Sequence, residues 1–152
     1  MTAHEQPGGV PGPPRYGTVY GAIAVLALAL NGTSFYFGAP NPGGEVYRES
    51  LWKMLERPHG MGLALVSLLM IFLMIGLCAY AAIRPVTSAT LPVVVTLIAL
   101  SGAVMLILKV GWGDSDPALD DGGIMLINTA LGAALLGIAH TIHLIVWRAR
   151  SR

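Results

Sequence analysis

Long apolar segments separated by short polar stretches dominate the pattern of this 152-residue chain. Four such segments run over residues 19–38, 60–83, 91–112 and 123–147. A bilayer core about 30 Å thick requires about 20 apolar residues in a helix that rises about 1.5 Å per residue. Each segment is long enough, so the pattern predicts four membrane-spanning helices.

The composition agrees with a membrane protein. Hydrophobic residues make up 55% of the chain and charged residues only 11%, whereas an average globular protein is about 25% charged. We therefore expect one all-α integral membrane domain, a four-transmembrane-helix bundle over residues 18–148, preceded by a flexible Gly/Pro-rich tail over residues 1–17. The net charge of +1 offers no basic footprint, so nucleic acid is excluded as a partner and membrane lipid is the expected surrounding.

The distribution of Lys and Arg near the span ends predicts the orientation. With an even number of spans, both termini and the 84–90 connection share one side, which carries Arg15, Arg84, Arg148, Arg150 and Arg152. The other side carries Arg48, Lys53, Arg57 and Lys109. We expect both termini in the cytoplasm of a multi-pass plasma-membrane protein, prokaryotic because nothing resembles an organelle address.

The first outer connection contains a short amphipathic pattern over residues 45–57. Tyr47, Leu51 and Leu55 recur at helical spacing, while Glu49 and Lys53 would pair one turn apart on another face. Pro58 ends the pattern, because the residue before a proline is disfavoured in a helix. This predicts a short amphipathic interfacial helix on the outer membrane surface, with a docking helix for a partner as the alternative.

The second outer connection is acidic, which is typical of a solvated surface, with a calcium site as the alternative. Lys109 is the only Asp, Glu, Lys or Arg within the four segments. Its long stem can extend toward the membrane surface, where we expect the ammonium group to pair with Asp114 or Asp116.

Three candidate metal ligands lie at a similar expected depth near the inner ends of the second and fourth spans. They are Cys78, His140 and His143. Thiolate and imidazole ligands suit copper(I) or zinc, so these residues predict a small metal site. The alternative is structural, because histidines near a helix C-terminus interact with the helix dipole and a lone cysteine packs as a small apolar residue.

His59 opens the second span from the outer side and is a candidate haem ligand. The Glu-x-x-His arrangement over Glu56–His59 resembles the start of a span in haem A synthase, a redox membrane enzyme built of two four-helix bundles, over four residues only. Asn128 stands where that resemblance implies a second histidine ligand. His59 and His140 lie at opposite membrane boundaries, so a haem bound here would need a ligand from another molecule.

Small residues in the fourth span predict a face for close helix packing, either inside the bundle or against a partner. They are Ala130, Ala133, Ala134 and Gly137.

The sequence carries no nucleophile elbow, histidine-rich zinc motif or phosphate-binding glycine loop, so enzymatic chemistry is not expected. The four segments also lack Asp and Glu, which argues against a carboxylate-driven transporter. We expect a small accessory or scaffold subunit of a larger membrane assembly, respiratory or transport, with other integral membrane subunits as partners and no cofactor. The alternative is a haem- or copper-handling redox or assembly factor.

Overall fold

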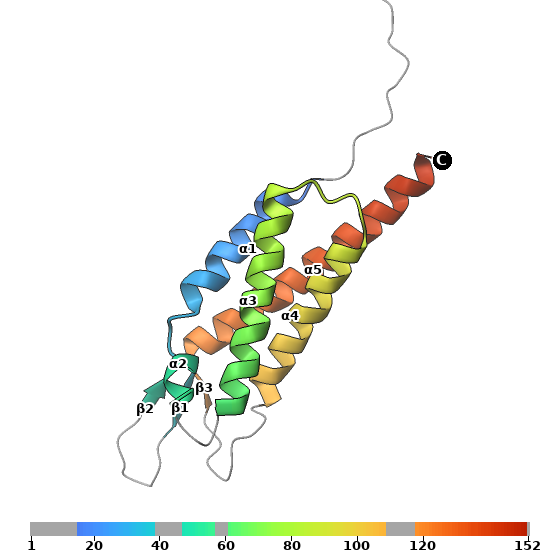
Figure 1. The fold of residues 1–152 in the computed structure, drawn as a ribbon. Coiled ribbons are helices and arrows are strands. Elements are labelled where there is room, and N and C mark those ends of the chain that lie inside the picture. The colour runs from blue at the N-terminus through green and yellow to red at the C-terminus, as the bar shows by residue number, and fades with distance from the viewer. Residues whose placement is uncertain (1–14, 39–46, 57–60, 109–117, 152) are drawn as a thin grey trace, which may run out of the picture.

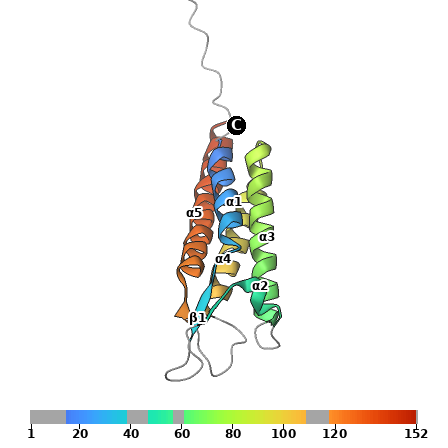
Figure 2. The same ribbon diagram turned by 90° about the vertical axis from the view of Figure 1, so that its left-hand side faces the viewer.

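Four long helices pack side by side and form the body of the protein (Figure 1). The computed structural model describes residues 15–38, 47–56, 61–108 and 118–151. The long helices are α1 (Gly17–Leu30), α3 (Met61–Ile83), α4 (Thr90–Leu108) and α5 (Asp121–Arg150). They pack in the ring order α1, α3, α4, α5, and Figure 2 shows α1 between α5 and α3.

Helices α3, α4 and α5 are long and apolar enough to cross a membrane. Their bounds lie close to the segments expected at 60–83, 91–112 and 123–147, although the described part of α4 ends at Leu108. Apolar side chains such as Leu65, Leu97 and Leu135 point outward from these helices, which is the arrangement expected where hydrocarbon is the solvent. The prediction of helices that could span a membrane is confirmed for these three.

The first apolar segment differs from the continuous helix expected over residues 19–38. Helix α1 ends at Leu30 after 14 residues, and Thr33 then bonds the carbonyl of Leu30 through both its amide, at 3.0 Å, and its hydroxyl, at 2.7 Å. Asn, Thr and Ser side chains compete for backbone hydrogen bonds, and glycine disfavours helix, so residues 31–34 end the helix. A hydropathy window does not detect this break because the flanking residues remain apolar.

A small antiparallel sheet closes the end of the bundle at which α1 finishes (Figure 1). Its strands are β1 (Tyr36–Gly38), β2 (Tyr47–Glu49) and β3 (Ala118–Leu119), in the order β2-β1-β3. Tyr36 pairs with Glu49 on one side and with Leu119 on the other. We call this the sheet end; the sequence analysis predicted no strands.

The amphipathic helix expected over residues 45–57 is instead a strand followed by one helical turn, α2 (Leu51–Met54). Tyr47 lies in β2 rather than on a helical face, because pairing with β1 supplies partners for its backbone. Glu49 is also in that strand, so the expected helical pair with Lys53 does not form. Ser50 caps α2 by accepting a hydrogen bond from the amide of Lys53. Leu51 is fully buried and Leu55 is half-buried.

The small residues of α5 pack inside the bundle, against α4. Ala133 is fully buried. A β-carbon added to Gly137 would lie only 2.6 Å from the carbonyl oxygen of Pro92 and would also collide with the hydroxyl of Thr96. That hydroxyl donates to the carbonyl of Pro92 and reaches the carbonyl of Ala134 across the two helices, at 3.3 Å. The predicted packing face, with Ala130, Ala133, Ala134 and Gly137, is therefore used within the chain and is not left for a partner.

Replacing Gly137 with alanine is expected to destabilise the protein by about 1–3 kcal/mol, because the added methyl group forces α4 and α5 apart. The matched control is Gly132→Ala in the same helix, where an added β-carbon meets nothing within 4 Å. Thermal unfolding of both variants in detergent micelles should show a loss for Gly137→Ala and an unchanged or slightly higher midpoint for Gly132→Ala. Equal midpoints would contradict the close contact.

Candidate functional site

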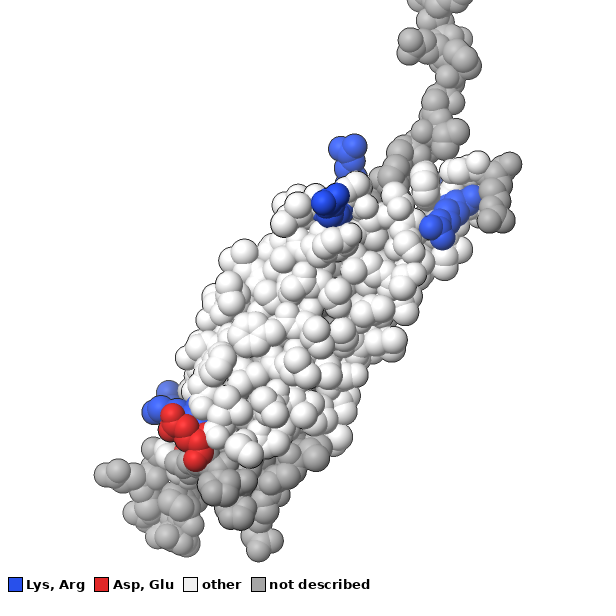
Figure 3. Space-filling view, viewed as in Figure 1, with Lys and Arg blue, Asp and Glu red and all other residues white. Residues whose placement is uncertain are grey.

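The two ends of the bundle carry different charges. Arg15, Arg84, Arg148 and Arg150 lie at the end opposite the sheet, which we call the arginine end. Figure 3 shows basic side chains at this end, acidic and basic side chains near the sheet end, and an uncharged band between them. Ionic groups are therefore confined to the two extremities on this face, as expected for a protein that crosses a hydrocarbon layer.

Two tyrosines and two histidines meet close to the arginine end. Tyr16 and Tyr20 are one helical turn apart at the start of α1, while His140 and His143 are three residues apart on α5. The hydroxyl of Tyr20 lies 3.2 Å from Nδ1 of His140, and the hydroxyl of Tyr16 bonds Nδ1 of His143. The ring of Tyr16 also packs on the ring of His140, with centroids 4.7 Å apart. We call these four residues the tyrosine–histidine cluster.

His140 and Tyr20 are the two buried members of the cluster, each with only 1% of its surface exposed. For His140, the two ring nitrogens differ. Its Nδ1 atom is held by Tyr20, whereas Nε2 has no hydrogen-bond partner within the described parts of the chain. When Nδ1–H donates to the tyrosine oxygen, Nε2 carries a free lone pair, the form in which histidine binds metals. His143 is exposed, so the cluster runs from a buried imidazole to the molecular surface.

The structure does not assemble the predicted metal site. Within the described ranges, no three His, Cys, Asp or Glu side chains lie close enough to hold a metal ion. Cys78 is fully buried on α3 and lies near Tyr20, while Nδ1 of each histidine faces a tyrosine hydroxyl. The prediction used depth along the helices, which says nothing about position around the bundle axis.

Other predicted residues fall outside the described part of the chain. His59, the candidate haem ligand, lies in the undescribed range 57–60. Lys109, Asp114 and Asp116 lie in the range 109–117. The haem ligand and the Lys109 ion pair therefore stay predictions.

Polar groups also gather at the sheet end, around the start of α5. Asp120 caps this helix by accepting a hydrogen bond from the amide of Asp121 at 2.9 Å, and its carboxylate lies 3.7 Å from Nε of Arg48. The hydroxyl of Ser34, the amide of Asp121 and the charge of Arg48 hold the pKa of Asp120 below its usual value. Asp120 is therefore ionised at neutral pH, as suits the positive end of the α5 dipole.

The sequence analysis missed the role of the two tyrosines. Their spacing of four residues places them on one helical face, and two histidines occur at the matching depth of α5. That combination of spacing and depth was the feature of the sequence that could have indicated the cluster.

Comparison of the chain with models of known protein families, with curated proteins and with solved structures finds no match. The geometry of the residues is thus the basis for any functional assignment.

Tyr20→Phe is expected to lower the stability by about 1–3 kcal/mol, because it leaves Nδ1 of the buried His140 without its partner while keeping the aromatic ring. Tyr80→Phe is the matched control, since Tyr80 is 57% exposed. Unfolding of the two variants and the parent protein in the same detergent tests this. A midpoint for Tyr20→Phe equal to that of Tyr80→Phe would show that the Tyr20–His140 contact contributes nothing.

Proposed function

We propose that all four long helices belong to membrane crossings, including the short helix α1. Tyr16 bonds His143 at one end, and the carbonyl of Phe35 accepts a hydrogen bond from the amide of Asp120 at the other, at 2.8 Å. Along α5, the stretch from residue 120 to residue 143 covers about 34 Å, slightly more than the hydrocarbon core. Residues 16–35 cover the same depth, because Tyr16 meets His143 and Phe35 meets Asp120 at the two ends of this stretch.

The arginine end is the proposed cytoplasmic end, with both termini inside a prokaryotic cell and the sheet end outside. The described acidic residues are Glu49, Glu56, Asp120 and Asp121, all near the sheet end, and the arginine excess follows the positive-inside tendency.

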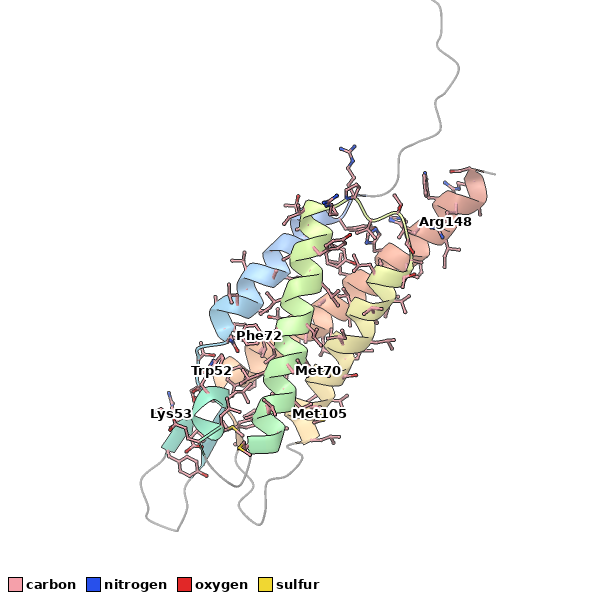
Figure 4. The ribbon with its side chains drawn as sticks, viewed as in Figure 1. Trp52, Lys53, Met70, Phe72, Met105 and Arg148 are labelled. Carbon is pink, nitrogen blue, oxygen red and sulfur yellow. The ribbon has the colours of Figure 1, made fainter. Side chains whose placement is uncertain are left out.

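The proposed outer membrane surface lies at α2, the remnant of the expected interfacial helix. Trp52 donates from Nε1 to the carbonyl of Asn31 at 3.2 Å and packs edge-on against Phe72 of α3 (Figure 4). An indole with a polar edge and an apolar body is suited to the boundary between lipid and water.

Cysteine labelling tests the four crossings. Cys78 is the only natural cysteine, so Arg15→Cys, Lys53→Cys and Ser151→Cys are made in a Cys78→Ala background. A membrane-impermeant maleimide should label Lys53→Cys in intact cells, and the other two only after permeabilisation. Labelling of Arg15→Cys and Lys53→Cys from the same side would contradict a crossing by α1.

The function best supported is that of a small accessory or scaffold subunit, acting through its outer surface within a larger membrane assembly. The observation that carries this proposal is the tight packing between α3, α4 and α5. The cavity between α3, α4 and α5, lined by residues such as Met70, Gly102 and Ala130, has a volume of only about 10 Å³, which is room for a single water molecule at most. Among the described residues, packing this tight argues against passage of a solute between these three helices.

Polar side chains inside the bundle connect its helices by hydrogen bonds. Tyr20 connects α1 to α5, Thr96 connects α4 to α5, and the buried hydroxyl of Tyr36 donates to the carbonyl of Leu106 at the sheet end, at 2.9 Å. Such hydrogen bonds between helices favour a rigid bundle. The surface left for other integral membrane subunits is therefore the apolar outside of the four long helices.

Site-specific photo-crosslinking tests the scaffold function. A photoreactive phenylalanine replaces Leu65 on α3, Leu97 on α4 or Leu135 on α5, three side chains that are at least 60% exposed. One face should yield a protein adduct of constant mass in native membranes, while the others label only lipid. Lipid labelling alone at all three positions, or crosslinks only between copies of this chain, would contradict an accessory subunit.

The buried imidazole of His140 favours a second candidate, a haem- or copper-handling factor. Metal-binding histidines are commonly held through their second ring nitrogen, as Tyr20 holds His140. An optical spectrum and metal analysis of the purified protein distinguish the two candidates. A haem band or stoichiometric copper that is lost in His140→Ala would favour this second function over the scaffold.

A further inference from the structure

Two adjacent cavities lie at the arginine end and share a wall formed by Pro85 and Val86. The first has a volume of about 260 Å³ and lies between the start of α1 and the end of α3. The second has a volume of about 340 Å³ and lies between the end of α3 and the start of α4. Neither cavity includes any member of the tyrosine–histidine cluster.

The first cavity is basic. Arg15, just before α1, and Arg84, just after α3, line it together with Gly17, the first residue of α1, and the last residues of α3. Helix α1 begins here without a capping side chain and without an acidic residue in its first turn, so the positive end of its dipole is uncompensated within the helix. Guanidinium groups bind phosphate oxygens with paired hydrogen bonds, and a helix start adds amide donors. The chemistry of this cavity fits a phosphate group.

The lining of the second cavity is part apolar and part polar. Leu77, Leu91 and Val94 are apolar, while Thr87, Ser88 and Thr90 are polar, with the last two hydroxyls 3.0 Å apart; we call these three the polar rim. This arrangement fits an acyl chain that meets an ester or glycerol group.

A third arginine stands beside the second cavity. Arg148 of α5 donates to the carbonyl of Thr87 at 2.7 Å and so fixes the connection between α3 and α4 (Figure 4). The polar rim therefore has a defined position next to a further positive charge.

We propose that the two cavities together bind one phospholipid with an anionic headgroup. The headgroup phosphate occupies the first cavity between Arg15 and Arg84, and the start of an acyl chain occupies the second, across Pro85 and Val86. A free phosphate ion would use only the first cavity, so the adjoining apolar cavity favours a lipid. Basic pockets between helices at a membrane surface commonly bind anionic lipid headgroups, and the site requires only that this end of the bundle lie at a bilayer surface.

Thermal unfolding of the delipidated full-length protein in a neutral detergent tests the site. Dioleoylphosphatidylglycerol should raise the midpoint by about 5 °C at a concentration near 100 times its dissociation constant. Dioleoylphosphatidylcholine, which has the same chains, and inorganic phosphate should each give a much smaller rise. An equal rise with phosphatidylcholine would show that only the chains matter, and an equal rise with inorganic phosphate would show a simple anion site. Either result would overturn the proposal.

The double variant Arg15→Gln/Arg84→Gln should lose most of the rise caused by phosphatidylglycerol. Arg150→Gln is the matched control, because Arg150 lies at the same end but lines neither cavity. An undiminished rise in the double variant, or an equal loss in the control, would overturn the site. Native mass spectrometry of the unaltered protein gives an independent measurement: one retained phosphatidylglycerol in excess over phosphatidylcholine is expected, and equal retention of the two lipids contradicts it.

Discussion

Backbone amides and carbonyls that leave a helix near a hydrocarbon layer must find partners within the protein, because no water is available to them. This constraint governs the sheet end. After α1 stops at Leu30, the amide of Phe35 bonds the carbonyl of Glu49 at 2.8 Å, and the carbonyl of Phe35 accepts from Asp120. The strands replace the hydrogen bonds that a longer helix would have made. The short α1 and the sheet together therefore provide partners for the backbone of this segment.

The same constraint explains the glycines at the start of α5. A β-carbon on Gly123 would lie 2.5 Å from the carbonyl oxygen of Phe35, so only glycine lets the extended chain approach the first turn of this helix. At the opposite end, the tyrosine–histidine cluster joins α1 to α5. The segment from Tyr16 to Phe35 is therefore held to the segment from Asp120 to His143 at both ends, by a backbone bond at the sheet end and by side-chain contacts near the arginine end. This supports treating residues 16–35 as one crossing unit.

Long apolar runs could be predicted from the sequence because hydropathy is a local property. Helix α3 follows the expected segment closely, since nothing between Met61 and Ile83 competes with its backbone hydrogen bonds. The sheet could not be predicted in the same way, because its strands are very short and come from three distant parts of the chain. For the candidate site, the sequence indicated how deep His140 and His143 lie along their helix. It did not indicate their tyrosine partners, because these depend on how α1 is rotated about its own axis relative to α5. The small residues of α5 indicated that another helix packs closely against it. They did not indicate that the contacting residues would be Pro92 and Thr96 of α4.

The order of the strands has a consequence for how this end of the molecule can meet other chains. Strand β1 is central and has both of its edges occupied, by β2 and by β3. A foreign peptide that extends the sheet by backbone pairing could therefore add only alongside β2 or β3, the lateral strands of the sheet. Strand β3 has two residues, Ala118 and Leu119, so β2 offers the longer template. Backbone pairing with another chain is thus restricted to the lateral strands, and the pairing of β1 with residues from two distant parts of the chain is left unchanged.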